Sequence, residues 1–504
     1  MSATLPERAA RHGGRVAIWS AGRSFSYDEL QHAATQAATV LLDGRSDLAE
    51  ERVAFLVPPS FEYVATQWGI WRAGGTAVPL PLSAPPAELR YMIEDADAAL
   101  VVASPELAGL IRPIAETRGV RLVTTAELLA GDLGPLPLVE PRRRAMIVYT
   151  SGTTGRPKGV VSTHAAILAQ VDALLEAWEW SPDDRALLVL PLHHVHGIVN
   201  VVCCALASGA ACEMHRGFDA AATWARLASG DITVFMAVPT IYRRLIAAWE
   251  AEAPERRREL SAAAARLRLM VSGSAALPVQ TLERWREITG HVLLERYGMT
   301  EIGMALSNPL RGERRAGSVG LPLPRVEVRL VDETGAPVAH GTPGELEVRG
   351  PNVFLEYWRR KDATAAAFRD GWFRTGDMAV LEDGRYRILG RTSVDIIKTG
   401  GEKVSALEIE EVLRTHPAVA ECAVVGVADP EWGERVSAAV ELRPGAGLTL
   451  EELASWARER LAPWKVPKAL VVVGELPRNA MGKVTKPDVA RLFGVPNVPR
   501  PSRF

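Results

Sequence analysis

Hydrophobic and polar positions alternate in a strand and helix pattern over the first part of the chain. Apolar runs that predict buried strands occupy residues 52–57, 99–103, 186–190, 232–238 and 267–272. Between them, apolar positions recur with a helical period over residues 88–96, 165–178 and 242–251. This alternation predicts an α/β fold of layered α/β subdomains with largely parallel sheets, in which functional loops lie at strand ends.

The pattern changes near residue 315. Short strand-like runs separated by turn residues, at 326–330, 344–348 and 386–388, predict a β-barrel-like subdomain at about residues 315–390. We assign this subdomain to a large N-terminal domain of residues 1–391. From residue 392 onward, helices are expected at 406–414 and 450–461 and strands at 423–427 and 436–442. Residues 392–504 therefore predict a small α+β C-terminal domain of a size that folds independently.

The bulk composition favours a soluble protein that acts on small molecules. The 504 residues exceed what one hydrophobic core usually supports, which also predicts at least two domains. A formal net charge of −2 supplies no basic excess for a nucleic acid or an anionic membrane. The start of the chain lacks an apolar stretch of signal-peptide length, and no segment approaches the roughly 20 apolar residues of a membrane-spanning helix. We expect a cytoplasmic protein with no nucleic-acid or membrane partner.

The cysteines are too few and too irregularly spaced for a disulfide framework; they are Cys203, Cys204, Cys212 and Cys422. Two of them lie inside an apolar run at residues 199–207. A thiol nucleophile is one interpretation, but this context favours small core residues.

The clearest chemistry lies in residues 149–159, Tyr-Thr-Ser-Gly-Thr-Thr-Gly-Arg-Pro-Lys-Gly, at the end of an apolar strand-like run. Glycines let the backbone turn its N–H groups toward an anion, the hydroxyls add donors, and Lys158 adds a positive charge. These features predict a loop that binds polyphosphate, with an ordinary turn between strand and helix as the alternative. A Walker A motif needs a hydroxyl residue after the lysine, and here Gly159 follows Lys158, which disfavours a P-loop NTPase.

Further motifs follow in a fixed order: Ser-Gly-Ser-Ala-Ala-Leu-Pro at 272–278, Arg-Tyr-Gly-Met-Thr-Glu at 296–301, Thr-Gly-Asp at 375–377, Gly-Arg at 390–391 and Asn-Ala-Met-Gly-Lys at 479–483. With the loop at 149–159, this order resembles the adenylate-forming superfamily of acyl-CoA synthetases, adenylation domains and luciferases over nearly the full length. The resemblance implies ATP, Mg²⁺ and CoA as reactants or cofactors, and a small C-terminal domain that moves.

The residues themselves suggest how the nucleotide is held. Tyr297 offers a ring for the base, and Asp377 can accept hydrogen bonds from both ribose hydroxyls. By resemblance, Thr300 contacts the α-phosphate, Glu301 binds Mg²⁺ and Lys483 completes the adenylation site, so these three are the predicted catalytic residues. The predicted ATP and AMP ligands are Thr150, Ser151, Gly152, Thr153, Thr154, Gly155, Lys158, Gly273, Ser274, Ala275, Tyr297, Gly298, Met299, Asp377 and Arg391.

The resemblance also assigns roles around the domain boundary. In the superfamily the C-terminal domain rotates about a residue two places after the arginine of the Gly-Arg pair, usually aspartate or lysine. Ser393 takes that position here, which makes it the predicted hinge. The loop at 398–403 matches the segment that faces the acyl-adenylate during thioester formation. Lys398 and Gly401 are therefore the predicted CoA and thioester residues, and Gly401 would let the pantetheine thiol pass close to the backbone.

Arginines in the predicted acid pocket favour a dicarboxylate. Arg296 precedes the Tyr-Gly-Met-Thr-Glu motif, and Arg243 and Arg244 lie on a predicted helix. A guanidinium can bind a carboxylate in two places, although a surface position is the alternative for Arg243 above all. Together with Leu-Pro-Leu-His-His-Val-His-Gly at 190–197, these segments look like malonyl-CoA synthetases. The predicted carboxylate ligands are Arg244, Arg296 and His194, and His196 is a further candidate for the pocket.

The sequence therefore predicts an ATP-dependent acyl-CoA ligase for malonate or a small substituted malonate. It would form an acyl-AMP and then a CoA thioester with release of AMP. One alternative is the same reaction on a short-chain or aromatic monocarboxylate. Another is an adenylation enzyme that loads an acyl-carrier protein, and a third is a binding protein that keeps only the fold. The presence of Glu301, Asp377 and Lys483 argues against the last.

Overall fold

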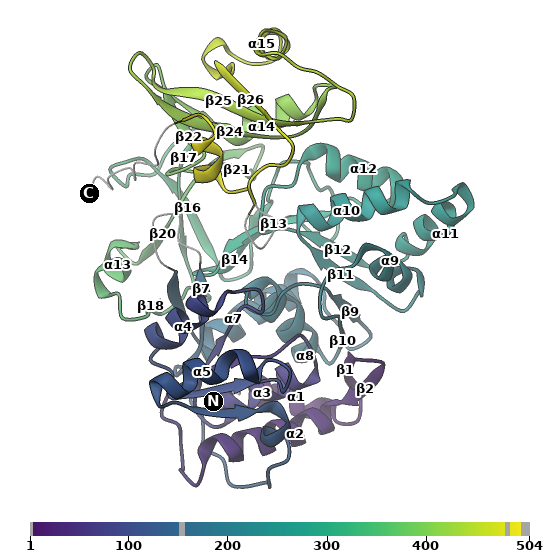
Figure 1. Ribbon diagram of the computed structural model, residues 1–504, viewed down its shortest axis with the longest axis vertical. Coiled ribbons are helices and arrows are strands. Elements are labelled where there is room, and N and C mark those ends of the chain that lie inside the picture. The colour runs from purple at the N-terminus through teal and green to yellow at the C-terminus, as the bar shows by residue number, and fades with distance from the viewer. Residues whose placement is uncertain (1–3, 151–156, 479–483, 495–504) are drawn as a thin grey trace.

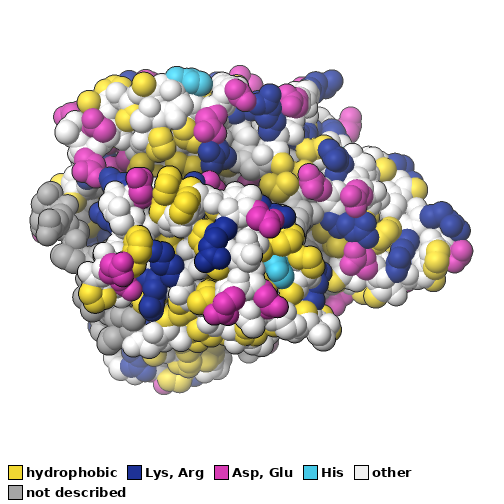
Figure 2. Space-filling model, turned by 90° about the horizontal axis from the view of Figure 1, so that it is seen from above, with side chains coloured by type: hydrophobic (Ala, Val, Ile, Leu, Met, Phe, Trp, Pro, Cys, Tyr) yellow, Lys and Arg dark blue, Asp and Glu magenta, His cyan; other side chains and the backbone are white. Residues whose placement is uncertain are grey.

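The computed structural model describes residues 4–150, 157–478 and 484–494. In Figure 1 the N-terminal region forms the larger, lower body, and the C-terminal elements lie above it. The described residues pair into four sheets, two of them large and mostly parallel. On the face shown in Figure 2, positive and negative side chains are intermixed, in keeping with the small net charge. In the described part of the chain, no helix is both long and apolar enough to cross a membrane.

The first large sheet has the strand order β18-β8-β7-β4-β3-β5-β6. The strands from β7 to β6 are parallel, whereas β8 is antiparallel to β7 and β18 is antiparallel to β8. The segment after the predicted phosphate loop is thus a strand and not a helix. The bounds are β3 Arg52–Leu56, β4 Thr76–Pro79, β5 Leu100–Ala103, β6 Arg121–Thr124, β7 Arg144–Thr150, β8 Lys158–Thr163 and β18 Glu356–Tyr357.

The second large sheet has the order β15-β14-β13-β12-β11-β9-β10-β1-β2 and is parallel from β13 to β1. Its carboxyl ends carry the Ser-Gly-Ser and Tyr-Gly-Met-Thr-Glu motifs, as expected for a parallel sheet. The bounds are β1 Val16–Ser20, β2 Arg23–Ser26, β9 Arg185–Leu188, β10 Ala211–Met214, β11 Val234–Ala237, β12 Leu269–Ser272, β13 Leu294–Met299, β14 Gly303–Ser307 and β15 Leu321–Pro322.

Helices of this region bury one face against the sheets. In α10 (Pro239–Glu250), proline starts the helix, and the apolar side chains Ile241, Tyr242, Leu245 and Ile246 recur with the helical period and are buried. The other helices are α1 Leu5–Ala9, α2 Tyr27–Leu42, α3 Phe61–Arg72, α4 Pro86–Asp95, α5 Ala108–Arg118, α6 Thr125–Leu128, α7 His164–Ala177, α8 Cys204–Ser208, α9 Ala220–Ala228, α11 Pro254–Ala264, α12 Val279–Thr289, the 3₁₀ turn η1 Ala10–His12 and the π-helical η2 His196–Cys203.

The predicted β-rich region is present, and its described strands pair as an open antiparallel sheet. Strand β20 (Trp372–Glu382) lies between β17 (Gly344–Arg349) on one side and β19 (Phe368–Arg369) with β21 (Arg385–Arg391) on the other, and β16 (Glu327–Val331) pairs with β17. Strand β18 lies between β17 and β19 in the sequence but pairs in the first large sheet. Helix α13 (Lys361–Ala366) follows β18.

The C-terminal region has its own sheet and its own apolar cores. Helix α14 begins and ends where the sequence predicts it, and Arg243 of α10 meets Glu421 of β24 at 2.8 Å across the boundary. All four cysteines are buried and reduced, which confirms them as core residues. The elements are β22 Ile396–Thr399, β23 Glu402–Ser405, α14 Ala406–Arg414, β24 Val419–Asp429, β25 Gly433–Leu442, α15 Leu450–Arg458, η3 Pro463–Lys465, β26 Ala469–Val473 and α16 Lys486–Arg491.

Candidate functional site

Asp377 lies between two predicted nucleotide ligands. Tyr297 donates its hydroxyl to Oδ2 of Asp377 at 2.5 Å, and Nε of Arg391 donates to Oδ1 at 3.0 Å. Asp377 pairs with Arg391 across the β20–β21 ladder, whereas Tyr297 comes from β13. Asp377 is only 7% exposed, so these bonds set its orientation. Each carboxylate oxygen keeps a lone pair that can accept a further hydrogen bond, as from a ribose hydroxyl.

The Asp377 carboxylate raises the pKa of both Tyr297 and Arg391. Burial and the neighbouring Asp377 carboxylate raise the pKa of Tyr297 well above its usual value, so the phenol remains a donor. Burial alone would lower the pKa of Arg391, but Asp377 outweighs burial and the pKa is raised. The Arg391 guanidinium therefore keeps its positive charge at neutral pH.

Glu301 is the predicted metal ligand, and it is 6% exposed. Tyr357 donates its hydroxyl to Oε1 of Glu301 at 2.9 Å, and the Phe354 N–H donates to the Glu301 carbonyl at 2.7 Å. Burial raises the pKa of Glu301, and Tyr357, Arg391 and Lys158 each oppose that rise. A buried carboxylate of this kind gains from an added cation, and a hard oxygen ligand suits Mg²⁺ shared with phosphate oxygens. The donor set therefore fits the predicted metal.

The two ends of the predicted phosphate loop meet in the β7–β8 ladder, where Thr150 pairs with Lys158. The ammonium of Lys158 lies 5.0 Å from the centre of the Tyr357 ring, within the range of a cation–π contact. The loop residues predicted between these ends lie outside the described residues, namely Ser151, Gly152, Thr153, Thr154 and Gly155. The ladder places Lys158 close enough to Glu301 for the two charges to interact.

Arg296 of β13 is a buried cation, only 3% exposed. Its Nη2 donates to Oγ of Ser274 at 3.4 Å, and that oxygen lies 3.1 Å from Nδ1 of His196. Within the described ranges, Nε of Arg296 has no hydrogen-bond partner. Burial lowers the pKa of Arg296 to about 9. A buried guanidinium is costly without an anion beside it, so this group is suited to bind an anionic ligand.

The other predicted acid ligands are placed differently. His196 begins η2 and faces Ser274, whereas the ring of His194 lies 4.1 Å from that of His193. Arg244 is exposed on α10. Tyr242, two residues earlier, is buried and donates to the Val271 carbonyl at 2.9 Å. The structure therefore gathers Arg296 and His196, and it puts Arg244 on the outer face of its helix.

The remaining predicted nucleotide residues lie on two loops and a strand. Gly273, Ser274 and Ala275 follow β12, and Ser274 has a φ of +70°, a left-handed conformation that is rare for serine. Gly298 and Met299 end β13, and Thr300 follows them. A Cβ on Gly298 would lie 2.0 Å from the Gly303 carbonyl, so only glycine fits there. Gly298 is therefore required by the close packing of β13 against β14.

The structure describes only some of the predicted site residues in the C-terminal region. Lys398 is exposed at the end of the β22–β23 hairpin, and Gly401 in its turn has a φ of +85°. Ser393 is exposed in the turn after β21, where Oδ2 of Asp395 accepts the Arg391 N–H at 3.0 Å. Lys483 lies outside the described residues.

Sequence reasoning missed Tyr357, which joins two of the predicted residues. Tyr357 belongs to a strand of two residues, and its contacts come from pairing with β8, far earlier in the chain. A tyrosine beside Trp358 was the one local signal, and it is too common to indicate a site.

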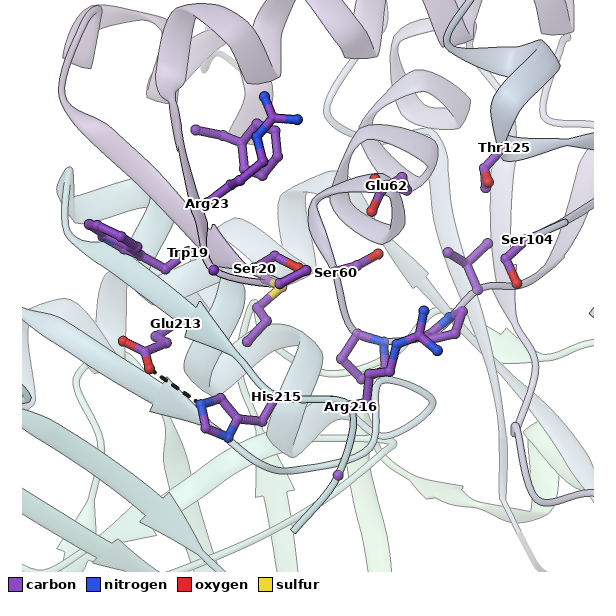
Figure 3. Close-up of a pocket in the computed structure, with 18 of the residues that line it drawn as sticks. Trp19, Ser20, Arg23, Ser60, Glu62, Ser104, Thr125, Glu213, His215 and Arg216 are labelled. Carbon is purple, nitrogen blue, oxygen red and sulfur yellow. Dashed lines mark hydrogen bonds and ion pairs between the residues drawn. The ribbon is translucent and has the colours of Figure 1, made fainter. Parts of the chain in front are cut away.

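A separate hollow of about 1180 Å³ lies near the β1–β2 hairpin. Figure 3 shows Glu213 and His215 at its wall, joined at 3.3 Å. Glu213 also pairs with Arg185 and Arg226. The lining includes none of the predicted nucleotide or acid ligands, and its principal charges are compensated within the wall.

Comparisons with known proteins place the chain in a family. Family profiles match at residues 5–358, described as AMP-binding enzyme, and at residues 408–483, described as AMP-binding enzyme C-terminal domain. A mitochondrial malonate–CoA ligase of Xenopus laevis is 50% identical over 472 residues, covering 86% of this chain and 82% of that protein. The human mitochondrial malonate–CoA ligase is 47% identical over 531 residues, covering 98% and 92%.

Among solved structures, ATP-bound MatB from Rhodopseudomonas palustris has a TM-score of 0.90 and 35% identity, covering 97% of this chain and 99% of that one. The match extends through both the large N-terminal domain and the small C-terminal domain, which confirms the predicted fold class. With the motif order, the buried Asp377 and Glu301 clusters and a family match over most of the length, this chain belongs to the family of AMP-binding enzymes.

Proposed function

We propose that this chain is an ATP-dependent malonate–CoA ligase that forms malonyl-AMP and then malonyl-CoA. The observation that carries the choice of acid is the buried guanidinium of Arg296 beside Ser274 and His196. A monocarboxylate has no second anion to offer this cation, whereas the distal carboxylate of malonate does. Relatives named malonate–CoA ligases, at 50% and 47% identity, support the same choice.

In the first half-reaction, an oxygen of the acid attacks the α-phosphorus of ATP. The bond from the α-phosphorus to its bridging oxygen breaks, and pyrophosphate leaves with the electron pair. Asp377 binds the ribose, Tyr297 faces the base, and Lys158 draws charge from the phosphates. Thr300 contacts the α-phosphate, and Arg296 holds the distal carboxylate away from the reacting one. Lys483 stabilises the departing pyrophosphate.

Glu301 would hold Mg²⁺, which supplies charge neutralisation between the phosphates and the acid. The role of the protein here is to keep the Glu301 carboxylate ionised and oriented. Tyr357 does so by donating to Oε1.

In the second half-reaction, the CoA thiol releases its proton to solvent and its sulfur attacks the acyl carbon. The bond from the acyl carbon to the phosphate oxygen breaks, and AMP leaves with the electron pair. We place the boundary of the moving domain after Arg391 and its hinge at Ser393. Rotation removes Lys483 and brings Lys398 and Gly401 to the acyl-adenylate. The exposed turn at Ser393 and the left-handed Gly401 support this assignment.

The experiment offers the purified enzyme Mg²⁺ and ATP with malonate, methylmalonate, succinate, acetate and benzoate, and follows pyrophosphate, AMP and CoA thioester. We expect malonate-dependent pyrophosphate release, and thioester formation once free CoA is added. Equal or faster release with acetate or benzoate would favour the monocarboxylate alternative. Release without transfer to free CoA, but with transfer to an acyl-carrier protein, would identify a carrier-loading enzyme.

The proposal includes a cytoplasmic location. Two of the compared relatives are named mitochondrial. Cell fractionation with an antibody to the chain decides between the two compartments.

A further inference from the structure

Tyr357 contacts two groups of the site through different parts of one side chain. Its hydroxyl donates to Oε1 of Glu301 at 2.9 Å, and its ring faces the ammonium of Lys158 at 5.0 Å from the ring centre. Glu301 and Lys158 have opposite charges; Glu301 lies in the turn between β13 and β14 of the second large sheet, and Lys158 begins β8 of the first. A single phenol therefore fixes the spacing between an anion and a cation that both face the nucleotide.

The backbone holds this tyrosine in place from two sides. Tyr357 pairs with Val160 of β8, and the Trp358 N–H donates to the Gly159 carbonyl at 2.8 Å, directly after Lys158. Three residues before Tyr357, the Phe354 N–H donates to the Glu301 carbonyl at 2.7 Å. The short segment 354–358 thus bonds to the backbone of Glu301 and to the backbone of Gly159, the residue next to Lys158.

Further contacts restrict the ring itself. The Tyr357 N–H donates to Oγ1 of Thr364 at 3.0 Å, and the ring packs edge-on against Phe354 at 4.8 Å between centres. A side chain packed in this way cannot follow Glu301 or Lys158 if either one moves. It therefore sets their positions, because a rigid neighbour with locked packing keeps a site within its productive geometry.

We propose that Tyr357 is a positioning residue that couples the metal-binding carboxylate to the phosphate-binding lysine, so that metal and triphosphate bind as one unit. This inference rests on the proposed function. The inference goes beyond the proposed function because it assigns the cooperation between Mg²⁺ and ATP binding to one side chain that contacts neither reacting atom. The hydroxyl positions Glu301, which would bind the metal, and the ring positions Lys158, which would bind the phosphates.

The test measures binding directly, with Mn²⁺ in place of Mg²⁺. Electron paramagnetic resonance follows free Mn²⁺ during titration of the enzyme–ATP complex, and calorimetry follows metal-free ATP. We expect Tyr357→Phe to weaken Mn²⁺ binding about tenfold, the usual effect of losing one hydrogen bond to a charged group, and to leave metal-free ATP binding within about twofold. Tyr357→Leu, which also removes the ring, should weaken both.

Tyr386→Phe is the matched control, because Tyr386 lies in β21 and belongs to neither contact. It should bind Mn²⁺ and ATP as the wild type does. Tyr357→Phe keeps the ring and its packing against Phe354, and thermal unfolding checks that the variant is folded. In a Glu301→Gln background, Tyr357→Phe should have no further effect on Mn²⁺ binding, since its acceptor has already been changed.

The inference is overturned if Tyr357→Phe binds Mn²⁺ as tightly as the wild type, or if it weakens Mn²⁺ equally in the Glu301→Gln background. Both results presuppose that the wild type binds ATP and Mn²⁺. A wild type that binds neither refutes the proposed function instead, so the two failures are distinguishable.

Discussion

The guanidinium of Arg296 lies directly against the backbone of Gly273. A Cβ placed on Gly273 would come 2.5 Å from both Cζ and Nε of Arg296, closer than real Cβ contacts allow. Gly273 has no side chain, and this absence is what lets the buried cation occupy its position behind the Ser-Gly-Ser loop. A glycine of the predicted nucleotide motif therefore also shapes the proposed acid pocket.

Gly273→Ala should displace Arg296 and weaken the acid site. Because Arg296 is buried, its guanidinium has little room to retreat, and overpacking of this kind usually costs about 1–3 kcal/mol. We expect the KM for malonate to rise at least fivefold and the melting temperature to fall. Initial rates at fixed ATP measure the first, and calorimetry the second. Unchanged values for both would show that the loop shifts at no cost.

Arg296→Ala should raise the KM for malonate far more than the KM for ATP. Truncating one partner of a buried charge pair typically costs about 2–5 kcal/mol, which is on the order of thirtyfold or more. Arg296→Lys should recover only part of the loss, because an ammonium lacks the planar fork.

Arg244→Ala, made alongside, tests the second predicted ligand, which is exposed here. We expect a much smaller effect than for Arg296→Ala, as measured by pyrophosphate release at varied malonate. An unchanged malonate dependence in Arg296→Ala would discard the dicarboxylate assignment.

Arg243→Glu should disfavour the present position of the C-terminal domain. Arg243 meets Glu421 at 2.8 Å, and reversal of its charge turns an attraction into a repulsion. The match to ATP-bound MatB at a TM-score of 0.90 favours the present position as the one that serves adenylation. A pair with one exposed partner is worth little, so we expect ATP–pyrophosphate exchange to fall about threefold, more at low salt than at high salt. Arg256→Glu on α11, also exposed, is the control. Loss of equal size in transfer from a supplied acyl-adenylate to CoA would contradict this assignment.

Glu295→Gln should stabilise the protein at alkaline pH. Burial raises the pKa of Glu295 to about 8, so the folded state holds a proton that the unfolded chain gives up near its ordinary pKa of 4.5. Stability is therefore lost progressively as the pH rises from about 4.5 to 8. Glutamine stays neutral and can still accept the Leu277 N–H, which donates to Oε1 at 3.3 Å.

We expect a gain in unfolding free energy of about 3 kcal/mol near pH 8 and less than about 1 kcal/mol near pH 5. Denaturant unfolding at the two pH values measures it. Glu283→Gln, exposed on α12, should show no such difference. The same gain at both pH values would mean that the carboxyl group does not titrate as stated.

Gly401→Leu should block thioester formation while adenylation persists. Gly401 has a φ of +85°, which L side chains rarely adopt, and a branched side chain in this turn would also stand in the path of the pantetheine thiol. ATP–pyrophosphate exchange and CoA thioester formation are measured separately. Gly371→Leu, at a φ of +79° in another turn, controls for backbone strain alone. Equal loss of both partial reactions in Gly401→Leu would refute the assignment of Gly401 to thioester formation alone.

The fold class could be predicted from the sequence, and several candidate nucleotide residues lie together as expected, because their signals are local motifs. Asp377, Glu301 and Arg296 each sit in a recognisable motif, Asp377 within β20, Arg296 within β13 and Glu301 in the turn that follows β13. Arg244 illustrates a weaker inference, because the helical period that buries Tyr242 already turns a residue two places later toward solvent. Tyr357 carried no usable signal, since its position depends on pairing with Val160, nearly two hundred residues away in sequence.

The pairing of β18 with β8 also has a consequence for biosynthesis. Val161 leaves the ribosome long before its partner Glu356, so the outer edge of β8 stays uncovered while the intervening chain is made. Open strand edges invite association with other chains, and an N-terminal fragment that stops before residue 356 keeps that edge permanently. Such a fragment should aggregate, whereas one extended through residue 391 supplies the missing strand and closes the edge.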